Sequence, residues 1–154
     1  MGRAVDVQNA RTRARGEYAQ ALARIDADGV CPFCEAHLPK HHTKPILFRN
    51  EHWLVTENAW PYDGTRHQFL IINRDHIESA EALPPGAWEA LGSAYRRLVN
   101  EYRIEGATLL LRTGMTDFTG ASVAHLHAQL ISGGRREADS ELIRALVGFK
   151  PKPA

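Results

Sequence analysis

The sequence lacks most features that would place it outside the ordinary globular proteins. It has two cysteines among 154 residues, too few for the disulfide framework of a small secreted domain. No apolar run approaches the roughly 18 residues of a membrane span, so we expect no membrane partner. Basic and acidic residues nearly balance, 19 against 18, which excludes the strongly basic surface typical of proteins that bind duplex nucleic acid. Met1–Gly16 is Arg-rich without an apolar core, so we expect no secretory signal and a cytoplasmic location.

The remaining composition is that of one globular domain. Hydrophobic residues make up 44% of the chain, which is within the range of folded domains and argues against global disorder. A chain of this length can bury a full core. We predict three segments: an N-terminal helical extension over residues 1–29, a main domain over residues 30–135, and a C-terminal helix and tail over residues 136–154.

The order of the predicted elements indicates an α+β fold with a mostly antiparallel, five-stranded sheet and flanking helices. Short apolar or alternating runs predict strands over residues 46–49, 53–56, 67–73, 108–112 and 123–132. Helical patterns cover residues 5–28, the segment that follows Pro84-Pro85-Gly86, and residues 137–147. The helix after residue 86 has its apolar positions at helical spacing: Trp88, Leu91, Tyr95, Leu98, Val99 and Tyr102. The open edges of such a sheet favour a homodimer.

The most informative segment is Gly120–Leu130, in which His125, His127 and Gln129 alternate with apolar residues. In a strand, alternation places the three polar side chains on one face and the apolar ones on the other. A solvated outer face would give the same pattern. The Gly-Ala-Ser sequence just before it favours a binding site, because such a loop can turn backbone N–H groups toward an anion.

A second cluster begins with Cys31-Pro32-Phe33-Cys34, whose spacing suits a metal knuckle. A lone CxxC can also be redox-active or incidental. Zinc needs four ligands, and spacing alone does not choose among the available histidines: His37, His41, His42, His52, His67, His76 and His125. We expect His41 and His42 to be solvated loop residues.

Three segments together resemble the histidine triad (HIT) superfamily. Residues 120–129 are similar to its signature Gly-Gln-Ser-Val-x-His-x-His-x-His, residues 31–34 to its CxFC, and residues 67–76 to its Gly-His-x-Leu-Val-Ile-Pro-Lys-x-His strand. The resemblance covers residues 30–135, which would be the catalytic domain. It implies an antiparallel sheet with flanking helices, a dimer, and a nucleotide or dinucleotide substrate.

The resemblance also implies roles for individual residues. His127 would be the nucleophile that forms a covalent nucleotidyl-histidine, and the backbone of Gly120, Ala121, Ser122 and Val123 would hold the α-phosphate, with help from the Ser122 hydroxyl. Asn58 would contact the nucleoside. Aromatic walls for the base are expected from Phe48, Trp53 or Trp60. Structural zinc would be bound by the ligands of the zinc-carrying members: Cys31, Cys34, His76 and His125.

Two residues depart from the family pattern. Gln129 replaces the third histidine, as in the branch of galactose-1-phosphate uridylyltransferase and diadenosine tetraphosphate phosphorylase. A neutral amide cannot act as an acid, so Gln129 favours transfer between phosphate groups over hydrolysis. Ala121 stands where hydrolase members often have Gln. The alternatives are a HIT-type nucleotide hydrolase and a nucleotide-binding protein with vestigial chemistry.

Overall fold

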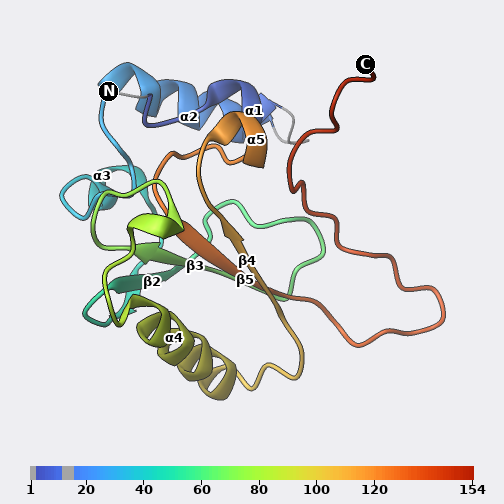
Figure 1. Cartoon of the computed structure of the whole chain (residues 1–154). Helices are drawn as coiled ribbons and strands as arrows, with labels where there is room; N and C mark the ends of the chain where they lie inside the picture. The colour runs from blue at the N-terminus through green and yellow to red at the C-terminus, as the bar shows by residue number, and fades with distance from the viewer. Residues whose placement is uncertain (1–2, 12–15) are drawn as a thin grey trace.

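The computed structural model describes residues 3–11 and 16–154. Its centre is a five-stranded antiparallel sheet in the order β1-β2-β3-β5-β4 (Figure 1). The strands are β1 (Ile46–Arg49), β2 (Trp53–Glu57), β3 (His67–Asn73), β4 (Thr108–Arg112) and β5 (His127–Ser132). This architecture confirms the predicted α+β class and antiparallel sheet. Within the described residues, no helix is long and apolar enough to cross a membrane.

Helices cover both faces of this sheet (Figure 1). The longest, α4 (Ala87–Glu101), lies on one face, and α2 (Gly16–Asp28) lies on the opposite side with the short helix α1 (Val7–Arg11) beside it. The remaining helical turns sit in the loops: α3 (Leu38–His41), the 3₁₀ turn η1 (Ala80–Ala82) and α5 (Thr116–Thr119).

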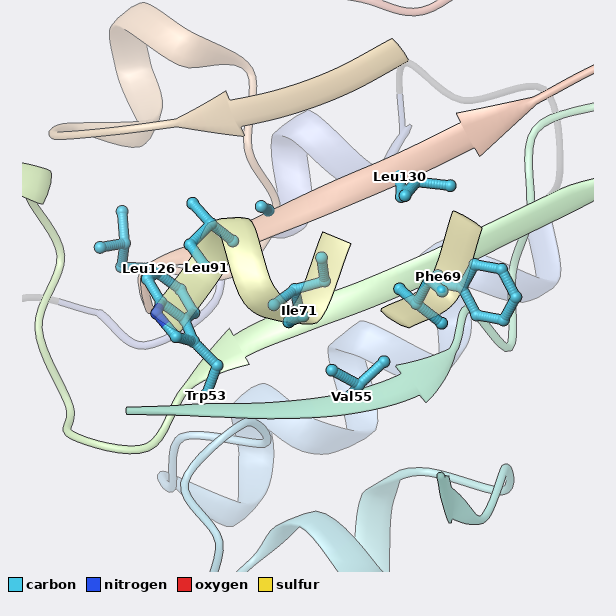
Figure 2. Packing of buried hydrophobic residues seen from close by; sticks show 10 residues of the cluster. Trp53, Val55, Phe69, Ile71, Leu91, Leu126 and Leu130 are labelled. Atoms are coloured by element: carbon cyan, nitrogen blue, oxygen red, sulfur yellow. The ribbon is translucent and has the colours of Figure 1, made fainter. Parts of the chain in front are cut away.

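The main core lies between α4 and the sheet (Figure 2). Trp53, Phe69 and Leu130 on the sheet are at most 1% exposed and belong to one cluster with Leu91 of α4. The Trp53 indole N–H donates a hydrogen bond of 2.8 Å to the Ala87 carbonyl, so the buried polar end of the ring is satisfied where the helix starts. Each large side chain buried here contributes roughly 1.5–3 kcal/mol.

The predicted apolar face of α4 is wrong at its first position. Trp88 is 54% exposed, while Ala87, one residue earlier, is buried. The buried positions of this helix are Ala87, Leu91, Ala94 and Leu98, which keep the spacing of three and four residues. Two of these buried positions, Ala87 and Ala94, are small residues. A prediction of the buried face that considers only large apolar side chains overlooks them.

The predicted strand over residues 123–132 begins later than expected, at His127. His125 therefore precedes the strand instead of sharing its polar face. The backbone before His127 bonds to other segments: Val123 forms an isolated antiparallel bridge with Val5, and the Leu126 N–H donates to the Ile77 carbonyl. These partners replace a neighbouring strand and leave His125 free to turn toward the cysteines.

The helix predicted over residues 5–28 is two helices, α1 and α2; residues 12–15 of that prediction lie outside the described residues. Ala10 of α1 and Leu22 of α2 belong to one buried cluster, together with Val5 and Val123. In a single straight helix, Ala10 and Leu22 would lie about 18 Å apart along the axis. The N-terminal segment therefore folds back on itself and packs against the loop before β5.

The predicted C-terminal helix is also wrong, because residues 141–154 carry no helix or strand. Leu142 is 88% exposed and Val147 72% exposed, so most large apolar side chains of this segment are not covered by the rest of the fold. A short helix without tertiary packing is marginal in water. The tail runs extended past β4 toward α5 (Figure 1). At Gly148, with φ +139°, an added Cβ would meet the Phe118 carbonyl oxygen at 2.6 Å.

Candidate active site

A cavity of about 900 Å³ opens between α2 and the sheet face that α4 does not cover. It is lined by the residues for which the sequence predicted a role in catalysis, in phosphate binding or in contact with the nucleoside: Asn58, Gly120, Ala121, Ser122, Val123, His127 and Gln129. These residues come from β5, from the loop directly before it and from the position that follows β2. The fold thus brings two separate segments of the sequence, around residue 58 and over residues 120–129, into one pocket.

His127 is held in a single orientation. Its Nδ1–H donates a hydrogen bond of 2.7 Å to the His125 carbonyl oxygen, and the Phe33 ring meets its ring edge-on, with centroids 4.9 Å apart. The side chain is buried, and this burial is the main cause that lowers the pKa of His127 to about 4. The imidazole is therefore neutral at pH 7, with its Nε2 lone pair as the nucleophilic position.

The loop before β5 has backbone amides available for an anion. The Ser122 carbonyl accepts from the Asp6 N–H, and the Ala124 N–H donates to the Ala4 carbonyl. Among the described residues, the N–H groups of Ser122 and Val123 have no such partner. Successive free amides of this kind form a nest for phosphate oxygens. Gly120, which precedes them, has φ +70° and ends α5, a conformation that favours glycine.

Asn58 follows β2 and lines the cavity. Its side-chain Oδ1 accepts from the Trp60 N–H at 2.8 Å, and its own N–H donates to the Gln68 carbonyl. These bonds fix the side chain and leave the Nδ2 donors for a ligand. Trp60 also lines the cavity and contacts the Tyr18 ring of α2, with centroids 5.9 Å apart. The two rings connect α2 with the loop after β2.

Gln129 is oriented by a chain of hydrogen bonds that the sequence analysis missed. The Tyr62 N–H donates to Gln68 Oε1, and Gln68 Nε2 donates to Gln129 Oε1, each at 2.6 Å. Because its carbonyl oxygen is occupied by this donor, Gln129 is left with its NH₂ group for the cavity. Alternation within β3 was the available signal, since Gln68, Leu70 and Ile72 share one face.

A separate group of four side chains lies beside the pocket. The ligand atoms of Cys31, Cys34, His76 and His125 all lie within 4.8 Å of one another. Cys31 Sγ is 3.3 Å from His125 Nδ1, and Cys34 Sγ is 3.4 Å from His76 Nδ1. His125 Nε2–H donates to the Asn73 carbonyl at 2.7 Å, which fixes the tautomer that presents Nδ1 to the cysteines.

The spacing of these four atoms fits a tetrahedral zinc ion. With Zn–S of about 2.3 Å and Zn–N of about 2.0–2.1 Å, neighbouring ligand atoms of a tetrahedron lie roughly 3.3–3.8 Å apart. Two of the sulfur–nitrogen distances, 3.3 and 3.4 Å, agree with this spacing, and a third, between Cys34 Sγ and His125 Nδ1, is slightly longer at 3.9 Å. Burial raises the pKa of the Cys31 thiol to about 11. A divalent cation has the opposite effect, since a coordinating thiol is deprotonated outright.

Other expectations differ from the structure. Of the aromatic residues expected as walls for a base, Trp60 lines the cavity, whereas Trp53 is in the core under α4 and Phe48 packs against that core. His41 and His42 are not solvated loop residues: the His41 side chain is 6% exposed, and His42 Nε2–H donates to Thr56 Oγ1 at 2.8 Å. Burial lowers the pKa of His42.

No protein-family model matches this sequence, and no curated protein matches it either. Solved structures of histidine triad proteins do match the fold. A histidine triad nucleotide-binding protein from Candida albicans is 16% identical with a TM-score of 0.54, covering 73% of this chain and 86% of that chain. A Zn-bound histidine triad family protein from Mycobacterium smegmatis is 16% identical with a TM-score of 0.52, covering 71% and 79%.

A protein described as HIT-like is 22% identical with a TM-score of 0.52, covering 63% of this chain and 93% of that chain. At these identities the likeness concerns the fold. The five-stranded antiparallel sheet with its flanking helices is thus the fold of the histidine triad proteins.

Proposed function

We propose that this protein is a zinc-stabilised enzyme of the histidine triad superfamily, which transfers a nucleotidyl group through a covalent intermediate on His127. The observation that carries the proposal is the fixed orientation of the neutral His127 imidazole in the cavity. Its Nδ1–H is bonded to the His125 carbonyl, and its ring lines the cavity beside the amides of Ser122 and Val123, which have no backbone partner in the described part of the chain. A neutral imidazole fixed in this way is a competent nucleophile toward phosphorus.

The reaction has two steps. His127 Nε2 attacks the α-phosphorus of a nucleotide, and the bond to the leaving oxygen breaks with its electron pair going to that oxygen. An acceptor oxygen then attacks the same phosphorus, and the electron pair of the P–N bond returns to Nε2. The amides of Ser122 and Val123 would stabilise the charge on the non-bridging oxygens. The Asn58 side chain would hold the nucleoside.

Gln129 favours a phosphate group over water as the acceptor. Its free NH₂ group can donate a hydrogen bond to a phosphate oxygen but cannot supply a proton. A phosphate group can leave or attack without the help of a proton donor or acceptor, whereas water needs a general base to be activated. We therefore propose transfer or phosphorolysis as the reaction, in the manner of the uridylyltransferase and phosphorylase branch that Gln129 resembles.

Cys31, Cys34, His76 and His125 would hold the zinc ion. All four positions would be filled by protein, so the ion would supply structural stability and leave no open position for a bound water. The free cysteines also favour a reducing compartment, and we propose that the protein works in the cytoplasm.

Intact-protein mass spectrometry tests the covalent step. The protein is mixed briefly with ADP, UDP-glucose or diadenosine tetraphosphate. We expect a mass increase of one nucleoside monophosphate less water, which acid removes and which is absent in His127→Ala. The adduct is then chased with phosphate or with buffer alone. Loss of the adduct only with phosphate identifies phosphate as the acceptor, and loss in buffer alone identifies water. Bound nucleotide without adduct or phosphate release would instead identify a binding protein with vestigial chemistry.

We further propose that two copies of the chain form a homodimer through the β4 edge. This strand is at the end of the sheet, and Leu109 on it is 41% exposed. An exposed apolar edge strand pairs readily with a second strand. Light scattering at micromolar concentration should give a mass near twice the 17.2 kDa of the chain. A mass of one chain would refute the dimer.

A further inference from the structure

Arg112 places a positive charge beside the nucleophile. It is the last residue of β4, and it lies directly opposite His127 in the pairing of β4 with β5. Residues that face each other in this way point to the same side of an antiparallel sheet. Accordingly, Arg112 lines the same cavity as His127 and Gln129.

The guanidinium of Arg112 is not neutralised by the described part of the chain. One nitrogen, Nη2, donates to the Tyr62 hydroxyl at 3.0 Å and to the Leu146 carbonyl. Within the described ranges, its Nε is buried without a hydrogen-bond partner, and no ion pair there includes Arg112. Arg49 and Arg97, by contrast, pair with Glu35 and Glu101.

A half-buried cation that is not paired with a carboxylate destabilises the folded protein, because its charge has lost part of its hydration. A bound anion can offset this cost. Its partners here, a phenol and a backbone carbonyl, are both neutral. The charge is therefore available to an anion within the cavity. Since a guanidinium presents several N–H donors in a planar fork, a phosphate group is the ligand that suits it best.

We propose that Arg112 binds the phosphate group that leaves when His127 attacks, so that the substrates are nucleotides whose α-phosphorus carries a phosphate leaving group. This inference rests on the proposed function. As the bond between the α-phosphorus and the bridging oxygen breaks, the electron pair goes to that oxygen and the phosphate departs as an anion. Arg112 stays protonated and neutralises this charge throughout.

Gln129 fits the same substrate class. An amine or a sugar hydroxyl is a poor leaving group unless an acid protonates it, and the Gln129 amide is no acid. A phosphate leaves without a proton when its charge is stabilised. Gln129 and Arg112 together therefore favour phosphate leaving groups.

The test compares two donors that share one nucleoside. One is the nucleoside 5′-diphosphate, assayed at a pH at which its terminal phosphate keeps one proton and leaves as hydrogen phosphate. The other is the 4-nitrophenyl ester of the 5′-monophosphate, whose leaving group has similar basicity and less charge. Adenosine and uridine pairs are both measured. In Arg112→Gln we expect kcat/KM to fall by about 10²–10³-fold for the diphosphate, the usual effect of removing one such donor, and by less than about fivefold for the ester.

Arg96→Gln is the matched control. It removes the same charge from an exposed site on α4 and should change neither donor. Arg112→Lys, which keeps the charge and loses the fork, should lie between Arg112→Gln and the unmodified protein. Equal losses on the two donors, or no loss on the diphosphate, would overturn the role of Arg112.

A binding measurement keeps this inference separate from the covalent mechanism. In a His127→Ala background, which cannot form the adduct, ADP should bind at least tenfold more tightly than AMP, and Arg112→Gln should remove that difference. If the difference is present but no adduct ever forms, the phosphate subsite stands and the proposed chemistry fails. If ADP and AMP bind equally well, the subsite is refuted even when the adduct is found.

Discussion

Substitution of His127 by alanine is expected to lower turnover by roughly 10⁴–10⁶-fold, the range found when a nucleophile is removed from a covalent enzyme. Nucleotide affinity should change by only a few-fold, because the backbone amides of Ser122 and Val123 and the side chain of Asn58 remain in place. The measurement is steady-state turnover of the donors that form the adduct, together with their dissociation constants. Loss of activity with retained binding is what separates a nucleophile from a residue that only shapes the pocket.

His67→Ala is the control for the His127 prediction. His67 also lies on the sheet, but its ring stacks on Phe69, on the face covered by α4. Its removal should leave turnover within a few-fold. If His127→Ala retains a tenth or more of the turnover, the covalent mechanism on this residue is excluded.

Substitution of Cys31 by serine is expected to release zinc and to lower the melting temperature. Structural zinc in small domains binds with apparent free energies of about 10–16 kcal/mol, and this energy contributes directly to folding. With one of four ligands lost, we expect bound zinc to fall from one ion per chain to near zero. A loss of roughly 3–5 kcal/mol in the free energy of unfolding would lower the melting temperature by about 10 °C in a chain of this size.

His37→Asn tests whether the Cys31 effect belongs to the metal. The His37 Nδ1–H donates to the Cys31 carbonyl at 3.2 Å, so this variant disturbs the same turn without removing a ligand. Zinc content should stay at one ion per chain, as elemental analysis would measure. A Cys31→Ser protein that keeps its melting temperature would contradict the structural role of the metal.

The sheet was largely predictable from the sequence, because its strands are continuous apolar runs between clear turns. The prediction for His67–Asn73 has the bounds of β3, and Asn50 forms the expected turn by accepting from the N–H groups of His52 and Trp53. The C-terminal segment shows the opposite case. Its pattern is helical, but the tertiary fold leaves most of its large apolar side chains exposed.

The part of the candidate site that lies close together in the sequence was predictable. The part that is brought together by the register between paired strands was not. The 120–129 segment carries its own alternation, whereas Gln68 meets Gln129 only because β3 and β5 pair with this register. Arg112 likewise reaches the pocket through the register of β4 with β5. Register depends on contacts between distant segments, so a single sequence does not specify these two neighbours.

The short bridge between Val5 and Val123 gives the first residues of the chain a part in the pocket. The Asp6 N–H and the Ala124 N–H bond across this bridge, on either side of the proposed phosphate amides. Such paired segments open together, as one cooperative unit. In a hydrogen-exchange experiment, residues 4–6 and residues 122–124 would then exchange together. A nucleotide that binds residues 122–124 would slow exchange in residues 4–6, and a binding partner that holds residues 4–6 would slow exchange in residues 122–124.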